Sequence, residues 1–217
     1  KVRFIGDELA AVAAIDEETA RRALELIRVD YELLPAVFDP FEALDASSPP
    51  IHDELPDLEG NVAMRWDFDH GDVVAAEAEA AVIVEGMYSS PQAAPAAIET
   101  HVVIAAFDPD GHLTVWSPVH MVFMYRKELA DCLGLDWQQI TIIQPPVGGS
   151  FGGKIDIDPH DFITVLLARK ARRPVRLVLS REDEFIGTRT RQPIHFQLRT
   201  RPDPEGNPPF PHAGTGR

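Results

Sequence analysis

The chain has 217 residues, of which 45% are hydrophobic and 25% are charged. These proportions are ordinary for a globular protein and exclude collagen, a coiled coil and a wholly disordered chain. The net charge of −15 argues against nucleic acid as the main partner, because phosphate backbones attract basic surfaces. A single cysteine, Cys132, excludes a disulfide framework and a Cys-ligated metal cluster. We expect neither a membrane span nor a secretory leader, and therefore a cytoplasmic protein.

The charge is distributed unevenly along the chain. Residues 1–164 carry 30 acidic and 9 basic side chains, whereas residues 165–201 carry 10 basic and 3 acidic ones. The basic block suits an anionic ligand, a partner or an acidic neighbouring face, and it equally suits a solvated helix and strand surface.

The first third of the chain predicts short elements and then a long irregular stretch. Residues 17–27 place apolar side chains at helical spacing, with Asp16 in position to cap the helix. An irregular, proline-interrupted stretch follows to about residue 68, which is typical of a linker or an interface segment. Short apolar runs predict strands over residues 2–5, 9–15 and 29–33.

From residue 72 onward, helical and strand patterns alternate. Helices are expected over residues 73–80, 122–133 and 158–170. Gly134 marks the end of the second helix, and Asp158-Pro159 marks the start of the third. Strands are expected over residues 81–87, 101–107, 113–116, 140–144, 174–179 and 194–201. The mixture predicts an α+β fold.

The most informative motif is the glycine loop, residues 148–154, which reads Gly-Gly-Ser-Phe-Gly-Gly-Lys after a predicted strand. Its four glycines allow positive φ angles and close approach of the backbone, so that free N–H groups can cradle an anion. A phosphate loop is one interpretation, but a Ser or Thr must follow Lys154 to hold magnesium, and Ile155 stands there. A purely structural glycine turn is a second interpretation.

The third interpretation is a resemblance. Pro-x-x-Gly-Gly-x-Phe-Gly-Gly-Lys, ending at Lys154, resembles the molybdenum-site loop in the large molybdopterin-binding subunit of the xanthine oxidase / aldehyde oxidase family. Ile98-Glu99-Thr100 lies where the family usually has Met-Glu-Pro. The resemblance extends over about residues 1–205 and is nearest to the branch with 4-hydroxybenzoyl-CoA reductase and bacterial aldehyde and aromatic hydroxylases.

The resemblance implies a division of the chain. Residues 1–45 correspond to the C-terminal part of an α/β hammerhead domain, and residues 46–70 to a linker. Residues 71–207 correspond to the first part of a molybdenum-cofactor-binding domain, and residues 208–217 form an irregular tail. Because hammerhead strands upstream of residue 1 are not in the sequence, we expect residues 2–5 and 29–33 to have exposed apolar faces.

The resemblance also implies an activity. The family oxidises aldehydes or aromatic and heterocyclic substrates, or reduces aromatic CoA thioesters, at a molybdenum–molybdopterin centre. Electrons pass to 2Fe-2S clusters and FAD, which are expected here on partner subunits of a heterotrimeric complex that can dimerise. By resemblance, the residues beside the cofactor are Gly148, Gly149, Phe151, Gly152 and Gly153.

The sequence departs from the family pattern in two places. His120 aligns with the glutamine that donates a hydrogen bond to a molybdenum oxo group, and imidazole can donate a similar bond. Ile155 replaces the Glu that purine-oxidising members often have, which argues against xanthine as substrate. The family's catalytic Glu is expected downstream of residue 217, so no catalytic residue is assigned and the chain alone is expected to be inactive.

Other candidates have weaker signals. Ser150 lacks the spacing of a nucleophile elbow. The histidines form no H-x-x-x-H pair, so no metal-ligating residues are predicted, and His160 and Asp161 are interpreted as decorating a helix start. Glu99 suits either a structural role near the site or a surface position at a strand end. The alternative to an enzyme is a non-catalytic αβ remnant or an assembly module.

Overall fold

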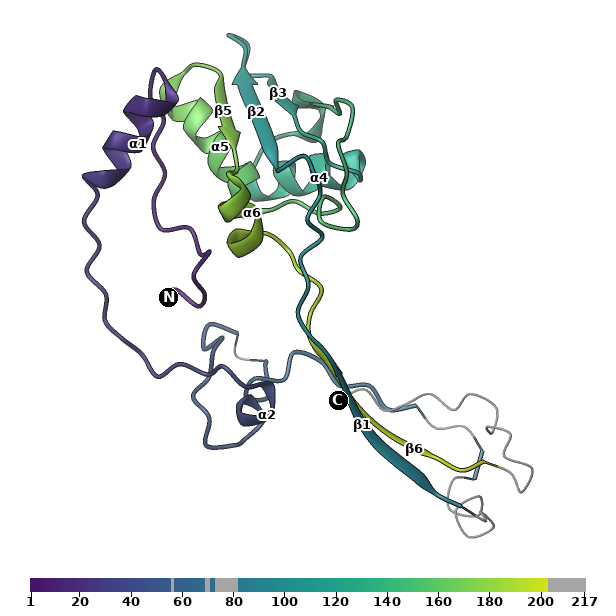
Figure 1. Cartoon of the computed structure of the whole chain (residues 1–217). Coiled ribbons are helices and arrows are strands. Elements are labelled where there is room, and N and C mark those ends of the chain that lie inside the picture. The colour runs from purple at the N-terminus through teal and green to yellow at the C-terminus, as the bar shows by residue number, and fades with distance from the viewer. Residues whose placement is uncertain (56, 69–70, 73–81, 203–217) are drawn as a thin grey trace. The chain divides into compact units, whose positions relative to one another are not determined.

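The computed structural model describes residues 1–55, 57–68, 71–72 and 82–202 (Figure 1). The chain divides into two compact units, each made of segments distant in sequence. The first unit combines Lys1–Asp30 with Ala94–Arg191, and the second combines Tyr31–Ala93 with Gln192–Arg217.

A four-stranded sheet with the order β4-β3-β2-β5 organises the first unit. The central strands β2 and β3 are antiparallel and joined by a turn at Gly111, whose φ is 87°. Strand β4 pairs parallel to β3, so that Val115 lies opposite both Ala105 and Ile142, and β5 pairs antiparallel to β2. The strands are β2 Val102–Phe107, β3 Leu113–Trp116, β4 Ile140–Ile143 and β5 Val175–Val178.

The helices of this unit begin and end at recognisable signals. Asp16 accepts a hydrogen bond of 2.8 Å from the Thr19 N–H at the start of α1, and Gly134 ends α4 in a left-handed conformation with φ 63°. Two short elements, η1 and α6, were not predicted. The elements are α1 Glu17–Glu25, α4 Val122–Leu133, η1 Trp137–Gln139, α5 Pro159–Ala171 and α6 Arg181–Gly187.

The core lies between one face of the sheet and helices α4 and α5 (Figure 1). Alternate residues of β2 and β3 face the helices, as the two-residue period of a strand requires. Helix α5 packs on β2 and β5, and α4 packs on β4. The largest fully buried side chains include Tyr125, Leu129 and Val165.

The second unit is built on a two-stranded antiparallel ribbon. Strand β1 (Val84–Ser90) pairs with β6 (Ile194–Thr200). A short helix, α2 (Pro40–Ala43), was not predicted; it brings the ring of Phe41 to 4.9 Å from the ring of His195.

Most predicted elements of the region after residue 82 are confirmed, with boundaries shifted by a few residues. The predicted strands over residues 2–5, 9–15 and 29–33 are wrong, because the structure has no strand in these segments. No strand among the described residues pairs with the backbone of these segments. Their apolar side chains are exposed, with Ile15 at 94% and Leu33 at 92%. The expected exposure of apolar side chains in residues 2–5 and 29–33 is confirmed.

The helix predicted over residues 73–80 and the tail over residues 208–217 lie outside the described residues. The fold combines helices and strands, in agreement with the coarse part of the predicted α+β class. The hammerhead part and the domain boundaries drawn from the sequence stay a prediction. In the part of the chain that the structure describes, no helix has the length and apolarity that crossing a membrane requires.

Candidate functional site

The glycine loop lies between β4 and α5, as the sequence predicts. It has positive φ angles at Gly149 (112°), Phe151 (50°) and Gly152 (93°). Ser150 closes the turn from inside: its carbonyl accepts the Gly153 N–H at 2.9 Å and its hydroxyl accepts the Lys154 N–H at 3.1 Å. The expectation that glycines of this loop adopt positive φ is therefore confirmed.

The outward backbone of the glycine loop offers free donors. Within the described residues, the N–H groups of residues 149–152 have no hydrogen-bond acceptor. Successive free N–H groups in a turn that combines negative and positive φ angles can form a concave site for an anion. This loop therefore has the backbone that an anionic, oxygen-bearing ligand requires.

A partly buried ion pair clamps both ends of the glycine loop. The Lys154 ammonium, whose side chain is 2% exposed, donates to the Glu99 carboxylate at 2.6 Å and to the Glu99 carbonyl at 3.0 Å. The same carboxylate accepts the Gly148 N–H at 3.0 Å. Burial alone would raise the pKa of Glu99, but the bonds from Lys154 and Gly148 outweigh it and lower that pKa. Of the two interpretations of Glu99, the structure supports the one that places it near the loop.

Little space is left for side chains on three of the glycines, and a Cβ on Gly153 would lie 3.2 Å from the Pro95 Cγ. A Cβ on Gly148 would lie 2.6 Å from the Glu99 Cβ, and one on Gly149 would lie 3.2 Å from the Ala97 Cβ. A Cβ on Gly152 would meet nothing within 4 Å, so this part of the loop is open. The loop is thus pressed against the residues before β2 on one side and accessible on the other.

The two remaining residues expected beside the cofactor are both at the surface of the chain. The backbone N–H of His120 donates to the Lys154 carbonyl at 2.8 Å, so His120 adjoins the end of the glycine loop. The side chain of Phe151 is 80% exposed. Neither lines the small pocket beside the loop, whose wall includes His101, Tyr125 and Lys154.

A buried polar cluster that the sequence did not predict lies under the loop. His101, just before β2, places its Nδ1 at 3.0 Å from both Glu184 carboxylate oxygens and its Nε2 at 3.0 Å from the Gly153 carbonyl. The backbone N–H of His101 also donates to Glu184 at 2.9 Å. The imidazole therefore links α6 to the glycine loop.

The start of α5 completes this cluster. Asp158 precedes the helix and accepts a bond of 3.2 Å from the Arg189 Nε, while its own N–H donates to Asp161 at 2.9 Å. Burial lowers the pKa of His160 to about 4, so its imidazole is neutral at pH 7. Burial likewise raises the pKa of Asp158 and that of Asp161, which accepts the Tyr125 hydroxyl at 2.6 Å.

His160 and Asp161 lie at the helix start, as expected, and Asp161 accepts the Asp158 N–H there in a capping box. The sequence did not predict that both side chains are buried in this cluster. A local signal was present: titratable residues directly follow Asp158-Pro159, a motif that fixes the helix start. No local signal pointed to Glu184, which lies 83 residues from His101 in sequence.

Comparison with known proteins identifies the family of the chain. The family model described as the molybdopterin cofactor-binding domain matches residues 51–207. The chain belongs to the molybdopterin cofactor-binding domain family. The resemblance to xanthine and aldehyde oxidases, and molybdenum–molybdopterin as the cofactor of the family, are thereby confirmed.

Several relatives carry the same domain. The chain is 32% identical over 200 residues to the nicotinate dehydrogenase large molybdopterin subunit of Eubacterium barkeri, covering 92% of this chain and 46% of the relative. It is 31% identical over 190 residues to the xanthine dehydrogenase molybdenum-binding subunit of Escherichia coli O157:H7, covering 88% of this chain and 25% of that protein. The solved Cu,Mo-CO dehydrogenase has a TM-score of 0.82 at 26% identity, covering 90% of this chain and 26% of the solved one. The chain therefore spans about a quarter to a half of the length of these relatives.

The described residues fit the molybdopterin family's cofactor at the glycine loop. An oxo-metal group or a phosphate is anionic and needs N–H donors that no Cβ obstructs. The free N–H groups of residues 149–152 and the open space above Gly152 meet this requirement. The Lys154–Glu99 pair is neutral in sum, so it holds the loop in place without adding a charge.

Proposed function

We propose that the chain is the glycine-loop segment of a molybdenum hydroxylase large subunit. In this proposal the glycine loop binds the molybdenum–molybdopterin cofactor through residues 148–153, with His120 beside it. The observation that carries the proposal is the row of free N–H groups on a loop clamped at both ends by Glu99. When bound, the cofactor supplies two-electron oxidation or reduction of an electron-poor carbon.

The residues of the chain have distinct parts in this arrangement. The backbone of residues 149–152 donates hydrogen bonds to oxygens of the bound group, and these donors need no reorganisation because the loop is already formed. Lys154 and Glu99 fix the spacing of the loop ends. His120 occupies the place of the family's glutamine and can donate from its ring to the same group.

The rest of the proposal concerns the whole protein. Aldehydes and aromatic or heterocyclic compounds are the proposed substrates, with reduction of an aromatic CoA thioester as a further reaction within the same chemistry. Electrons pass to 2Fe-2S clusters and FAD, which this proposal assigns to partner subunits. The single cysteine of these 217 residues cannot ligate such a cluster. Residues 1–45 belong to a hammerhead domain, residues 71–207 to the first part of the cofactor domain, and the complex is cytoplasmic.

The test is the variant Gly149→Val in the intact subunit that contains this sequence. A branched side chain at φ 112° and 3.2 Å from Ala97 would displace the loop, so we expect loss of bound molybdenum and pterin. Gly111→Val is the matched control, because Gly111 also has positive φ (87°) but lies in the β2–β3 turn away from the loop. Molybdenum and pterin content are measured beside circular dichroism.

Equal molybdenum content in Gly149→Val and Gly111→Val would contradict the assignment of the loop. A folded parent subunit that never contains molybdenum would instead support the alternative, a non-catalytic αβ module. The isolated 217-residue chain is expected to show no hydroxylase turnover, because it lacks the general base that the family places downstream.

A further inference from the structure

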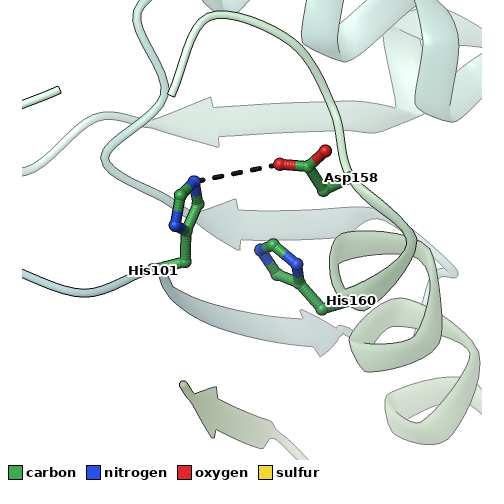
Figure 2. Close-up of side chains that lie close together, drawn as sticks. All are labelled: His101, Asp158 and His160. Carbon is green, nitrogen blue, oxygen red and sulfur yellow. Dashed lines mark ion pairs between the residues drawn. The ribbon is translucent and has the colours of Figure 1, made fainter. Parts of the chain in front are cut away.

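The buried cluster under the glycine loop brings together three metal-ligating side chains from two segments. His101 precedes β2, and Asp158 and His160 lie at the start of α5, as Figure 2 shows. One ligand atom from each residue lies within 4.8 Å of the others, and all three residues are buried. We propose that His101, Asp158 and His160 form a binding site for a divalent transition-metal ion, with zinc as the best match.

Two ligand atoms of this cluster have nothing to bind. Asp158 Oδ2 and His160 Nε2 are buried and have no hydrogen-bond partner in the described part of the chain. A buried polar atom without a partner destabilises the fold, so such atoms are rare unless a bound species satisfies them. A cation satisfies both at once, because a carboxylate oxygen and an imidazole lone pair are both electron donors.

The spacing of the cluster suits a tetrahedral ion. The His101 Nε2 and Asp158 Oδ2 atoms are 3.8 Å apart (Figure 2). Ligands at about 2.0–2.2 Å from a tetrahedral zinc ion lie about 3.4 Å from each other. The His101–Asp158 pair must therefore approach by about 0.4 Å, and the pairs with His160, whose ligand atoms lie within 4.8 Å, by at most about 1.4 Å. The Gly153 carbonyl, 3.0 Å from the same Nε2, is a candidate for the fourth ligand.

Outer hydrogen bonds already orient two of the ligands. The Glu184 carboxylate accepts from Nδ1 of His101, so Nε2 is the atom that faces the cluster. Nε2 lies 3.0 Å from the Gly153 carbonyl, and a bound ion would replace the proton that Nε2 donates to that carbonyl. Arg189 binds Asp158 Oδ1, which leaves Oδ2 free to coordinate. A carboxylate behind a ligating histidine is the usual support of a protein zinc ligand.

The ligand set selects the class of ion. Two imidazoles and one carboxylate favour zinc and its first-row neighbours over magnesium and calcium, which prefer oxygen ligands alone. Since Gly153 belongs to the glycine loop, the ion would tie that loop to the start of α5 and to the beginning of β2. The site is therefore a structural one, separate from the molybdenum cofactor.

The first measurement is the metal content of the full chain. The purified protein is stripped with a chelator, titrated with zinc sulfate in a calorimeter, and dialysed before elemental analysis. We expect one zinc ion per chain and a rise in the unfolding temperature, with X-ray absorption showing nitrogen and oxygen ligands at about 2.0–2.1 Å. Failure of the unaltered chain to retain zinc would overturn the proposal and leave a buried water as the species in the cluster.

Variants assign the zinc to this cluster. Asp158→Asn and His160→Gln should lose the retained ion, and Glu184→Gln should weaken zinc binding by about 10–100-fold. His112→Gln is the matched control, since this exposed histidine bonds Thr141 at 2.8 Å and lies outside the cluster. Zinc affinity unchanged in Asp158→Asn would overturn the assignment, as would loss of zinc in His112→Gln. If His160→Gln does not fold, Glu184→Gln still decides, because it leaves all three ligands in place.

Discussion

The region from Ala94 to Arg191 and the segment from Lys1 to Asp30 belong to the same unit, yet they use their apolar residues differently. In the first, β2 and β3 direct alternate side chains into a core shared with α4 and α5. In the second, Ile5 and Ile15 are exposed, and α1 has no buried residue. The difference shows that an apolar run becomes a strand only where another strand completes its hydrogen bonds.

The comparison also explains where the candidate site lies. The glycine loop and the cluster of His101, Asp158 and His160 both belong to the packed region. A loop that must present N–H groups in fixed directions needs a rigid scaffold, and β4 and α5 supply it. Changes in the packed region should therefore be costly, and changes in the exposed segments should be small.

The largest effect is expected for Leu129→Ala. Leu129 of α4 is fully buried in the core, so its truncation leaves a cavity and should lower the free energy of unfolding by about 2–5 kcal/mol. Urea unfolding of the full chain followed by circular dichroism measures the change. A loss below about 1 kcal/mol would show that this region is not the stable part of the molecule.

Glu99→Gln tests the clamp on the glycine loop. It removes the charge that balances buried Lys154, so we expect a loss of about 1–3 kcal/mol at pH 7. The pKa of Glu99 lies below its ordinary value of 4.5 in the fold, so its contribution is present above pH 4.5 and is lost as the pH falls through the lowered pKa. The difference between the two proteins should therefore shrink in acid, and a difference that is constant from pH 7 to pH 3 would contradict the role of the clamp.

A glycine pair separates close contact from backbone strain. Gly148→Ala places a Cβ 2.6 Å from Glu99 and should cost about 1–3 kcal/mol by forcing the clamp apart. Gly152→Ala meets no atom within 4 Å, so only its φ of 93° opposes the change, at about 1 kcal/mol. Thermal unfolding of both variants should rank Gly148→Ala as the less stable, and the reverse order would place the tight side of the loop at Gly152.

The sequence predicted the packed region well because its signals are local. Gly134 and Asp158-Pro159 marked helix ends, and the strand at residues 113–116 was placed correctly because a turn and an alternating pattern bound it. Helix α6 was not predicted, although Ser180 and Asp183 form a capping box at its start. The strands predicted over residues 2–5, 9–15 and 29–33 were wrong because an apolar run does not by itself show whether a partner strand exists.

The candidate site also has one part that the sequence predicted and one part that it did not. The glycine loop was found from its composition, since clustered glycines after a strand have few other uses. The cluster under it depends on Glu184, His101 and Asp158, which tertiary packing alone brings together. Motifs for metal sites are defined by short spacings in sequence. They therefore do not group His101 with Asp158, which lies more than 50 residues away.

The smallest effect is expected for Leu33→Ala. Leu33 is 92% exposed, so its truncation removes almost no buried apolar surface. The free energy of unfolding should therefore change by at most about 0.5 kcal/mol. The measurement is the same urea titration used for Leu129→Ala, so that two leucines in one chain are compared directly. Residue 33 lies in a predicted strand that the structure lacks. A loss above about 1 kcal/mol would mean that Leu33 is covered in solution, by a second copy or by a strand pairing with residues 29–33, and a concentration-dependent loss would identify the copy.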